Sequence, residues 1–186
     1  MKCIQLIFLI GFYGQGALDL RFGDETNFSM MPNVPYGWLP KGKQGTIASD
    51  SKRVLNVFGL MNFGQQLSTY PTKGSINSDF IIEVINDFSK TVDKLTVIVL
   101  DNAPWHTSNK IKEQIENWEE QGIFIFYLPT YSPHLNPIEI LWRKVKYEWL
   151  KPKNFESPEI LKNAILNIFQ KFGNEFSIRF SKNLSL

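Results

Sequence analysis

Three carboxylates stand out in this sequence because each lies where a predicted element of secondary structure begins or ends. Asp24 follows a segment of alternating polarity, Asp101 follows a continuous apolar run, and Glu139 lies near the start of a predicted helix. In open α/β sheets, ligands gather outside the carboxyl ends of the strands. An ionised aspartate there needs a compensating charge, which a metal ion can supply. The three acids are therefore candidates for one shared site.

Three converging carboxylates imply a particular chemistry. Like charges within a few ångströms of one another raise each other's pKa unless a cation neutralises them. Hard cations such as Mg²⁺ prefer oxygen ligands and keep several waters and substrate phosphates. Two such ions about 3.5–4 Å apart stabilise the attacking and leaving oxygens of a phosphoryl transfer. Because Cys3 is the single cysteine, a cysteine zinc cluster is excluded, and magnesium-dependent phosphodiester chemistry is indicated.

Two of these acids also have a purely structural interpretation. Asp101 precedes Asn102-Ala103-Pro104 and could act as a cap or turn residue. Asn136 is a good N-cap with Pro137 at the first helical position, and Glu139 then falls where a capping box places its acid. That local role explains Glu139 when it is considered alone.

The helical wheel of residues 137–150 weakens the capping interpretation. Its apolar stripe consists of Ile138, Leu141, Trp142, Val145 and Trp149. A different face carries Glu139, Arg143, Lys146 and Leu150 close together. One carboxylate and two cations on one face fit a site for a metal and a phosphate backbone. The alternative is an ordinary ion pair between Glu139 and Arg143 on a solvated face.

The elements that must position these acids follow an α/β pattern. Strands are predicted over residues 18–23, 53–63, 65–70, 95–100 and 123–128, with the first one ending at Asp24-Glu25. Helices are predicted over residues 78–90, 108–121, 137–150 and 157–171. Residues 32–46 are rich in Pro and Gly, which predicts turns with one short strand at most around Trp38. The order β-β-β-α-β-α-β-α-α predicts a mixed sheet.

The composition is that of one globular domain. The 186 residues are 43% hydrophobic and 20% charged, and the net charge of +2 neither requires nor excludes a nucleic-acid partner. Residues 1–16 stay unassigned. Their apolar run, Ile4 to Phe12, is similar to the core of a signal peptide, but it is too short to span a bilayer and lacks a good cleavage site. We therefore expect a cytoplasmic protein without a membrane segment.

Three motifs resemble the catalytic domain of Tc/mariner-type transposases, in particular their bacterial insertion-sequence branch. The first motif comprises Gly23 to Phe28 and Tyr36 to Gly42, the second runs from Asp101 to His106, and the third runs from Leu128 to Glu139. Between Asp101 and Glu139 lie 37 residues, within the family's usual mid-thirties range. The resemblance covers roughly residues 17–150, and the third motif is the most specific.

This resemblance implies a ribonuclease H-like fold, with a mixed five-stranded sheet flanked by helices, and a DDE-type nuclease and strand transferase. Asp24, Asp101 and Glu139 would be the ligands of two Mg²⁺ ions, with Mn²⁺ as a substitute. Water activated by the metal would cut the transposon end, and the freed 3′-hydroxyl would attack target DNA. The partner would thus be double-stranded DNA. That fold places the first Asp on the first strand, the second just after the fourth, and the Glu on a helix after the fifth.

Other residues match motif positions with less specific roles. Asn102, His106, Asn136 and Pro137 support the motifs, although a satisfied structural role is the alternative for His106. His134 is expected to pack within its loop. Glu25 should point away from Asp24 on a strand, so we do not count it as a ligand. DNA phosphates could be contacted by Lys41, Lys43, Arg143, Lys144 and Lys146, with solvated cations as the alternative for each.

The resemblance also predicts how the chain is organised. Residues 1–16 are unassigned, 17–150 form the catalytic domain, and 151–186 form a C-terminal helix and tail. The helix-turn-helix modules that normally precede this domain do not fit before Asp24. We therefore expect a separately encoded helix-turn-helix part or a full-length transposase as a partner, and a homodimer on DNA.

Two other hypotheses remain open. One is a catalytically silent remnant that binds DNA or a partner transposase. The other is a carboxylate-pair glycosidase, which would not depend on magnesium.

Overall fold

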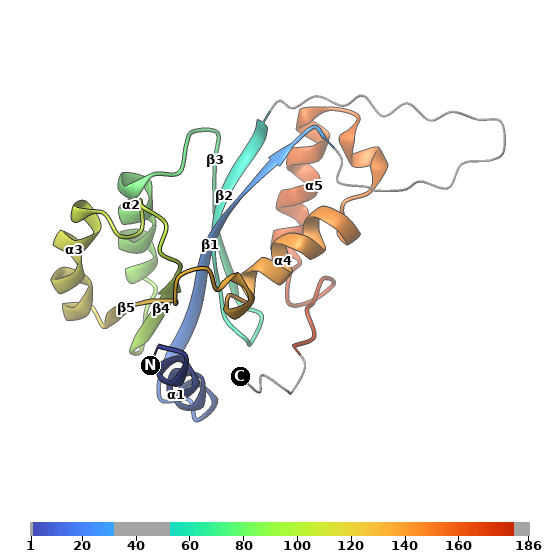
Figure 1. The fold of residues 1–186 in the computed structure, drawn as a ribbon. Coiled ribbons are helices and arrows are strands. Elements are labelled where there is room, and N and C mark those ends of the chain that lie inside the picture. The colour runs from blue at the N-terminus through green and yellow to red at the C-terminus, as the bar shows by residue number, and fades with distance from the viewer. Residues whose placement is uncertain (1, 32–52, 181–186) are drawn as a thin grey trace, which may run out of the picture.

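The computed structural model describes residues 2–31 and 53–180. Its centre is a five-stranded sheet with the strand order β3-β2-β1-β4-β5 (Figure 1). The strands are β1 (Asp19–Ser29), β2 (Arg53–Met61), β3 (Leu67–Thr72), β4 (Thr96–Leu100) and β5 (Ile123–Tyr127). β1 runs antiparallel to β2 and parallel to β4, and β4 runs parallel to β5. The sheet is therefore mixed, as the order of elements predicts.

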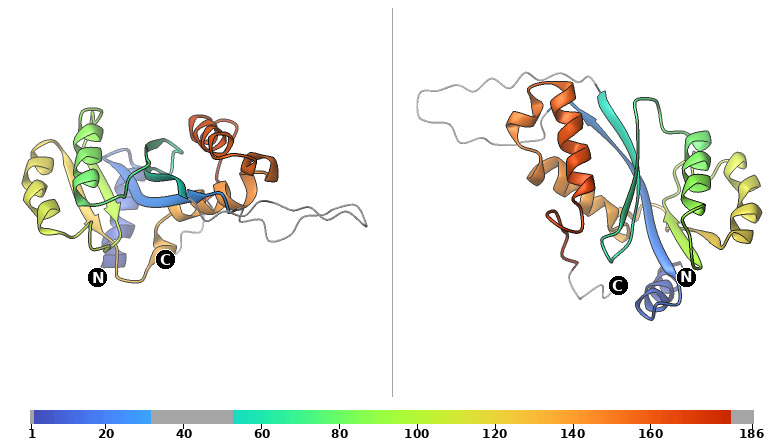
Figure 2. Two further views of the ribbon diagram at one scale, coloured as in Figure 1. Left: turned by 90° about the horizontal axis from the view of Figure 1, so that it is seen from above. Right: turned by 180° about the vertical axis from the view of Figure 1, so that it is seen from behind.

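Helices cover both faces of the sheet. Those of the described ranges are α1 (Lys2–Gly14), α2 (Ser78–Ser89), α3 (Asn109–Glu120), α4 (Ile138–Lys144) and α5 (Pro158–Gln170), with short 3₁₀ turns at Pro133–Leu135 and Pro152–Phe155 and a π-helical turn at Val145–Trp149. Figures 1 and 2 show α2 and α3 on one side of the sheet and α4 and α5 on the other. None of the helices in these two ranges is long and apolar enough to cross a membrane.

The two faces of the sheet bury two separate cores. Ile98 and Leu100 of β4 pack with Trp118 of α3 on one face, whereas Val97 and Val99 pack on the other face with the cluster that contains Trp142. Side chains of a strand alternate between faces, so a central strand with two covered faces is apolar throughout. This explains the run from Thr96 to Leu100, in which every residue is buried, whereas Leu95 precedes the strand and is exposed.

Local signals fix the ends of three helices. The side chains of Asn77, Ser108 and Ser157 accept hydrogen bonds from the backbone N–H groups of Phe80, Ile111 and Ile160, and so cap α2, α3 and α5. The turn between α3 and β5 requires a φ of +79° at Gly122, which glycine adopts without steric cost.

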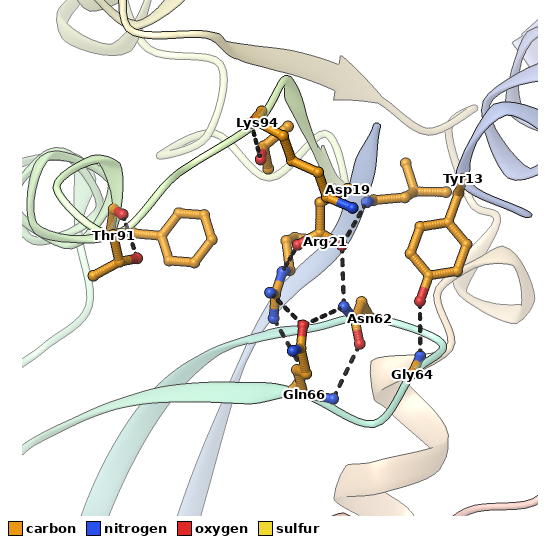
Figure 3. Close-up of polar contacts among 11 residues, drawn as sticks. Tyr13, Asp19, Arg21, Asn62, Gly64, Gln66, Thr91 and Lys94 are labelled. Carbon is orange, nitrogen blue, oxygen red and sulfur yellow. Dashed lines mark hydrogen bonds and ion pairs between the residues drawn. The ribbon is translucent and has the colours of Figure 1, made fainter. Parts of the chain in front are cut away.

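A buried polar cluster joins the start of β1 to the turn between β2 and β3 (Figure 3). Asp19 is 7% exposed, forms an ion pair with Arg21, and accepts a 3.0 Å hydrogen bond from Asn62 Nδ2. Arg21 Nη2 and Asn62 Nδ2 both donate to Gln66 Oε1, at 2.9 and 2.8 Å. A buried carboxylate requires such partners. These contacts fix the beginning of the strand on which Asp24 lies.

The first strand is longer than predicted. β1 continues through Asp24 and Glu25 to Ser29, because β2 pairs with it from Phe22–Met61 to Ser29–Arg53. The prediction that this strand ends at Asp24-Glu25 is therefore wrong, and Asp24 lies in the middle of a strand. Two adjacent acids suggest the end of a strand, but here β2 provides the backbone pairing that continues β1 past them.

Two further predictions of secondary structure need correction. The helix predicted over residues 137–150 is α-helical only to Lys144, continues as the π-helical turn, and ends before Leu150, which is buried in the core. Within the unassigned segment 1–16, Lys2–Gly14 form α1, with Leu6 buried and Ile4 and Phe8 exposed. The turns predicted for residues 32–46 lie outside the described residues.

Candidate active site

The three predicted carboxylates line one cavity of about 330 Å³. Asp24 comes from the middle of β1, Asp101 follows β4 directly, and Glu139 lies in the first turn of α4. The segment from Leu128 to Pro133, which follows β5, lines the same cavity. The structure thus brings together side chains that are far apart in the sequence.

Asp24 is the most enclosed of the three acids. Trp142 Nε1 of α4 donates a 3.0 Å hydrogen bond to its Oδ2. Burial raises the pKa of Asp24 to about 8, with further increases from the charges of Glu25, Glu139 and Asp101. A carboxylate in this position is stabilised in its ionised form by a nearby cation.

Gly59 makes room for the tryptophan beside Asp24. It is the β2 residue paired with Asp24, and a Cβ atom there would lie 2.8 Å from Cη2 of Trp142. Only a residue without a side chain allows the indole this close to the strand. On its other side, Trp142 packs against Phe169 of α5 with ring centroids 6.0 Å apart. The C-terminal helix therefore supports the site from behind.

Asp101 is held at one of its two oxygens. Oδ1 lies 3.0 Å from the backbone N–H of Ala103 and 2.7 Å from Nδ1 of His106. The hydrogen bond from His106 is the main reason that the pKa of Asp101 is lowered, against an opposing effect of burial. This acid is therefore ionised at neutral pH, with Oδ2 left free of protein hydrogen bonds among the described residues.

His106 is buried between two carboxylates. Its Nε2 lies 3.4 Å from Oε2 of Glu25, whose Oε1 accepts a 3.1 Å hydrogen bond from Trp105 Nε1. Burial opposes a charge on His106, but the contacts with Asp101 and Glu25 outweigh it and raise its pKa to about 9. Glu25 does not line the cavity, as predicted from its place next to Asp24 on a strand. Its contact with His106 was not predicted.

Asn136 does not cap α4, contrary to the prediction. The helix begins at Ile138 after Pro137, without a side-chain cap. Asn136 Nδ2 instead donates a 3.1 Å hydrogen bond to the carbonyl oxygen of Gly23, and its backbone carbonyl accepts from the N–H of Glu139 at 3.1 Å. The residue thus connects the third motif to the strand segment next to Asp24. The capping-box explanation of Glu139 is wrong for the same reason.

A second hydrogen bond joins the motifs. Asn102 Nδ2 donates to the carbonyl oxygen of Leu128. The turn after β4 is thereby tied to the end of β5, where the third motif begins. The side-chain amides of Asn102 and Asn136 thus both donate hydrogen bonds to backbone carbonyls of other segments.

Glu139 also lines a neighbouring cavity of about 540 Å³ that carries positive charge. Arg143 and Lys146 line it, together with the exposed His134, which was expected to pack within its loop. Burial raises the pKa of Glu139, whereas the charge of Lys146 lowers it. In the described part of the chain no salt bridge joins Glu139 to Arg143. The face predicted by the helical wheel therefore borders the cavity, except for the buried Leu150.

The remaining predicted cations differ in their surroundings. Lys144 forms an ion pair of 2.6 Å with Glu148. The Nζ atom of Lys146 lies 5.6 Å from the centroid of the Phe28 ring, and burial lowers its pKa while Glu139 and Asp24 oppose this effect. Lys41 and Lys43 lie outside the described residues.

The donor set around the first cavity fits a divalent cation. Oxygen ligands are those that Mg²⁺ prefers, and it keeps several waters rather than a complete protein cage. Within residues 2–31 and 53–180, no three His, Cys, Asp or Glu side chains are close enough to enclose an ion by themselves. Asp24, Asp101 and Glu139 nevertheless line one cavity, and mutual repulsion contributes to the raised pKa of Asp24. A bound cation would remove that repulsion.

Sequence reasoning missed the residues that support the acids. Trp142 was assigned to the apolar stripe of its helix. Its ring does pack in the core, but its indole N–H donates a hydrogen bond to Asp24. Gly59 gave a weak signal, because a glycine inside an apolar strand often marks a close approach. Nothing in the sequence indicated that Glu25 contacts His106.

Comparisons with known proteins show which family and which fold the chain shares. A family model described as DDE superfamily endonuclease matches residues 19–162. The transposable element Tcb2 transposase of Caenorhabditis briggsae is 28% identical over 140 residues, which make up 67% of this chain and 50% of that protein. The chain spans about half the length of the curated relatives it matches.

Two solved structures show the same fold. The Mos1 transposase, in a paired-end complex with the left transposon end, aligns with a TM-score of 0.62 and 16% identity over 91% of this chain and 53% of that one. The catalytic core domain of HTLV-2 integrase in complex with magnesium aligns with a TM-score of 0.50 and 16% identity, over 82% and 84%. The expected ribonuclease H-like fold is therefore confirmed.

Proposed function

The chain belongs to the DDE superfamily endonucleases, and on that premise we propose that it is the catalytic domain of a transposase that cuts and joins DNA. The reaction would be hydrolysis of a phosphodiester bond at a transposon end, followed by attack of the freed 3′-hydroxyl on target DNA. Asp24, Asp101 and Glu139 would be the catalytic residues. Residues 17–150 would carry the chemistry, and α5 (Pro158–Gln170), the helix of the C-terminal segment 151–186, would support it.

One observation carries this proposal: Asp24, Asp101 and Glu139 line the same cavity. The first two have an oxygen fixed by a hydrogen bond, from Trp142 and from His106. Carboxylates that are held in place around one space are what a hard cation and a phosphate require. The cavity with Arg143 and Lys146 adjoins at Glu139, so that a DNA backbone near the acids would find positive charge.

The three acids would bind Mg²⁺, or Mn²⁺ in its place, and we propose two ions. Bound metal of this kind lowers the pKa of a nucleophilic water and polarises the phosphoryl oxygen. The chain's own residues orient the ligands: His106 fixes Asp101, Trp142 fixes Asp24, and Asn136 ties the segment before Glu139 to β1. The substrate would be double-stranded DNA.

We also propose protein partners that act with the chain on DNA. As the family resemblance implies, we propose that DNA ends are recognised with a helix-turn-helix part encoded separately or with a full-length transposase. A homodimer on DNA is proposed by analogy with the family.

Nicking of supercoiled plasmid by the purified chain tests the proposed chemistry. Reactions at low salt with Mg²⁺ or Mn²⁺ favour non-specific contacts with phosphates. We expect metal-dependent nicking that Asp101→Asn and a chelator both abolish. Loss of activity in a variant that keeps its circular dichroism spectrum and Tm assigns the effect to the site. A folded wild-type chain that never nicks DNA would contradict the proposal and favour a silent remnant.

A further inference from the structure

His106 is the most enclosed polar side chain next to the site. It is 0% exposed, and its ring lies 6.1 Å from that of Phe58, in the core between the sheet and helices α2 and α3. Its backbone carbonyl accepts a 2.8 Å hydrogen bond from the hydroxyl of Tyr127. The ring therefore has a fixed place, from which its two nitrogens point to two different acids.

Glu25 reaches His106 from the opposite face of β1 to the one that carries Asp24. Asp24 contacts Trp142 of α4, whereas Glu25 contacts Trp105 and His106. Adjacent residues of a strand point to opposite faces. Two neighbouring acids in the first motif therefore serve different purposes, one in the cavity and one behind it.

The contact between Glu25 and His106 is long but has no competitor. Nε2 and Oε2 are 3.4 Å apart, beyond an ordinary hydrogen bond, and both atoms are buried without another hydrogen-bond partner among the described residues. A buried N–H and a buried carboxylate oxygen are costly when they are left alone. The contact between Nε2 of His106 and Oε2 of Glu25 therefore offsets part of the cost of burying both atoms.

We propose that Glu25 and His106 are positioning residues that fix the carboxylate of Asp101 in the orientation needed to bind a divalent cation through Oδ2. This inference rests on the proposed function. His106 Nδ1 and Ala103 N both donate to Oδ1, while the Asp101 side chain is 54% exposed. Without His106, the backbone N–H of Ala103 would be the one remaining donor, among the residues that the structure describes, to a carboxylate that is otherwise open to solvent. Outer partners of this kind commonly orient metal ligands.

The two nitrogens of His106 can be removed separately by substitution. In His106→Asn, the amide nitrogen can take the place of Nδ1 near Asp101, but nothing reaches Glu25. In His106→Gln, the longer amide can take the place of Nε2, but Asp101 loses its donor. His106→Ala removes both contacts. A positioning role predicts different results for Asn and Gln, whereas a packing role does not.

The experiment measures Mn²⁺ binding to the full chain at constant pH, from the decrease of the free Mn²⁺ signal in electron paramagnetic resonance. We expect His106→Gln and His106→Ala to weaken Mn²⁺ binding by about 10–100-fold. The Mn²⁺ affinity of His106→Asn should stay within about threefold of that of the wild type, because its amide nitrogen can still donate to Oδ1 of Asp101. Trp118→Phe, which loses a hydrogen bond to Asn86 in the core behind the sheet, is the control for loss of stability alone.

A double-mutant cycle tests the role of Glu25. If Glu25 acts through Nε2, then Glu25→Ala should weaken Mn²⁺ binding more in the wild-type background than in His106→Asn, which has already lost Nε2. Equal effects in the two backgrounds would show that Glu25 acts only by its own charge and would overturn its positioning role.

Three outcomes separate the hypotheses. Mn²⁺ affinity that follows Tm across all His106 variants and Trp118→Phe would overturn the positioning role and leave a structural histidine. Equal losses in His106→Asn and His106→Gln, from folded proteins, would do the same. Absence of Mn²⁺ binding by the wild-type chain would overturn the metal site itself, and with it both the proposed function and this role.

Discussion

The indole N–H of Trp142 donates a 3.0 Å hydrogen bond to Oδ2 of Asp24. The helix that carries Glu139 therefore also orients the first carboxylate, so two of the three acids depend on one element. α4 has seven residues and is followed directly by a π-helical turn. Its position comes from packing rather than length, since Ile138, Leu141 and Trp142 are all buried against the sheet.

Trp142→Phe should separate this hydrogen bond from the packing of the ring. Phenylalanine keeps an aromatic side chain against Phe169 but has no donor for Asp24. We expect a loss of about 1–3 kcal/mol in the free energy of unfolding, as for a buried polar group left without its partner. Plasmid nicking should fall further than stability explains. Urea denaturation and nicking assays check this, and Trp118→Phe is the matched control for a lost indole hydrogen bond. Nicking unchanged from the wild type would contradict an orienting role of Trp142.

Gly59→Ala should disturb the same contact from the strand side. The added Cβ would lie 2.8 Å from Cη2 of Trp142, so the indole must move away from Asp24. Overpacking of this kind costs about 1–3 kcal/mol. Thermal denaturation should show a lower Tm, together with reduced nicking. Gly11→Ala in α1, where a Cβ meets nothing within 4 Å, is the control and should leave Tm unchanged or raised.

The fold and the three acids were predictable because both depend on patterns that the sequence carries. The run of residues 95–100 indicated a strand with two covered faces, and Asp101 follows it directly. Motif order then placed Asp24 on the first strand and Glu139 on a helix after the fifth, as observed. Local polarity thus indicated the strands and helices, and the family resemblance placed the acids on them.

The supporting contacts were not predictable, because each joins residues distant in the sequence. Asn136 looks like a helix cap from its neighbours, yet it bonds to the carbonyl of Gly23. Trp142 looks like an ordinary core residue until the position of Asp24 is known. The π-helical turn after Lys144 likewise reflects tertiary packing, which buries Val145 and Leu150. Periodicity describes which face is apolar, but not which single polar atom on that face finds a partner.

Arg143 and Lys146 should contribute to DNA affinity through charge rather than sequence. Both line the cavity next to Glu139. Replacing either by Gln should lower the affinity for duplexes of any sequence and reduce the slope of log K against log salt by about 0.9. Lys144→Gln, in which an ion pair with Glu148 is lost, should change the slope less. Fluorescence anisotropy at several salt concentrations measures both quantities. Equal slopes for all three variants and the wild type would exclude these phosphate contacts.

The metal-free chain should lose stability as pH rises from about 6.5 to about 9. Asp24, with a pKa raised to about 8, keeps a proton in the folded state that the unfolded chain releases near pH 4. His106, with a pKa raised to about 9, likewise keeps its proton after the unfolded chain has lost it near pH 6.5. Where the folded state binds more protons, the free energy of unfolding falls with increasing pH.

Thermal denaturation with a chelator should therefore give a Tm that decreases across this range, by about 2–4 °C for each kcal/mol lost. Asp24→Asn keeps an acceptor for Trp142 but does not titrate, so its Tm should decrease less. Mg²⁺ should raise the Tm of the wild type more at pH 8 than at pH 6, because the metal competes with the proton on Asp24. A decrease of Tm as large in Asp24→Asn as in the wild type would contradict the enclosed, repelling environment assigned to Asp24, since an exposed carboxylate would be ionised in both states throughout this range and would add no pH dependence.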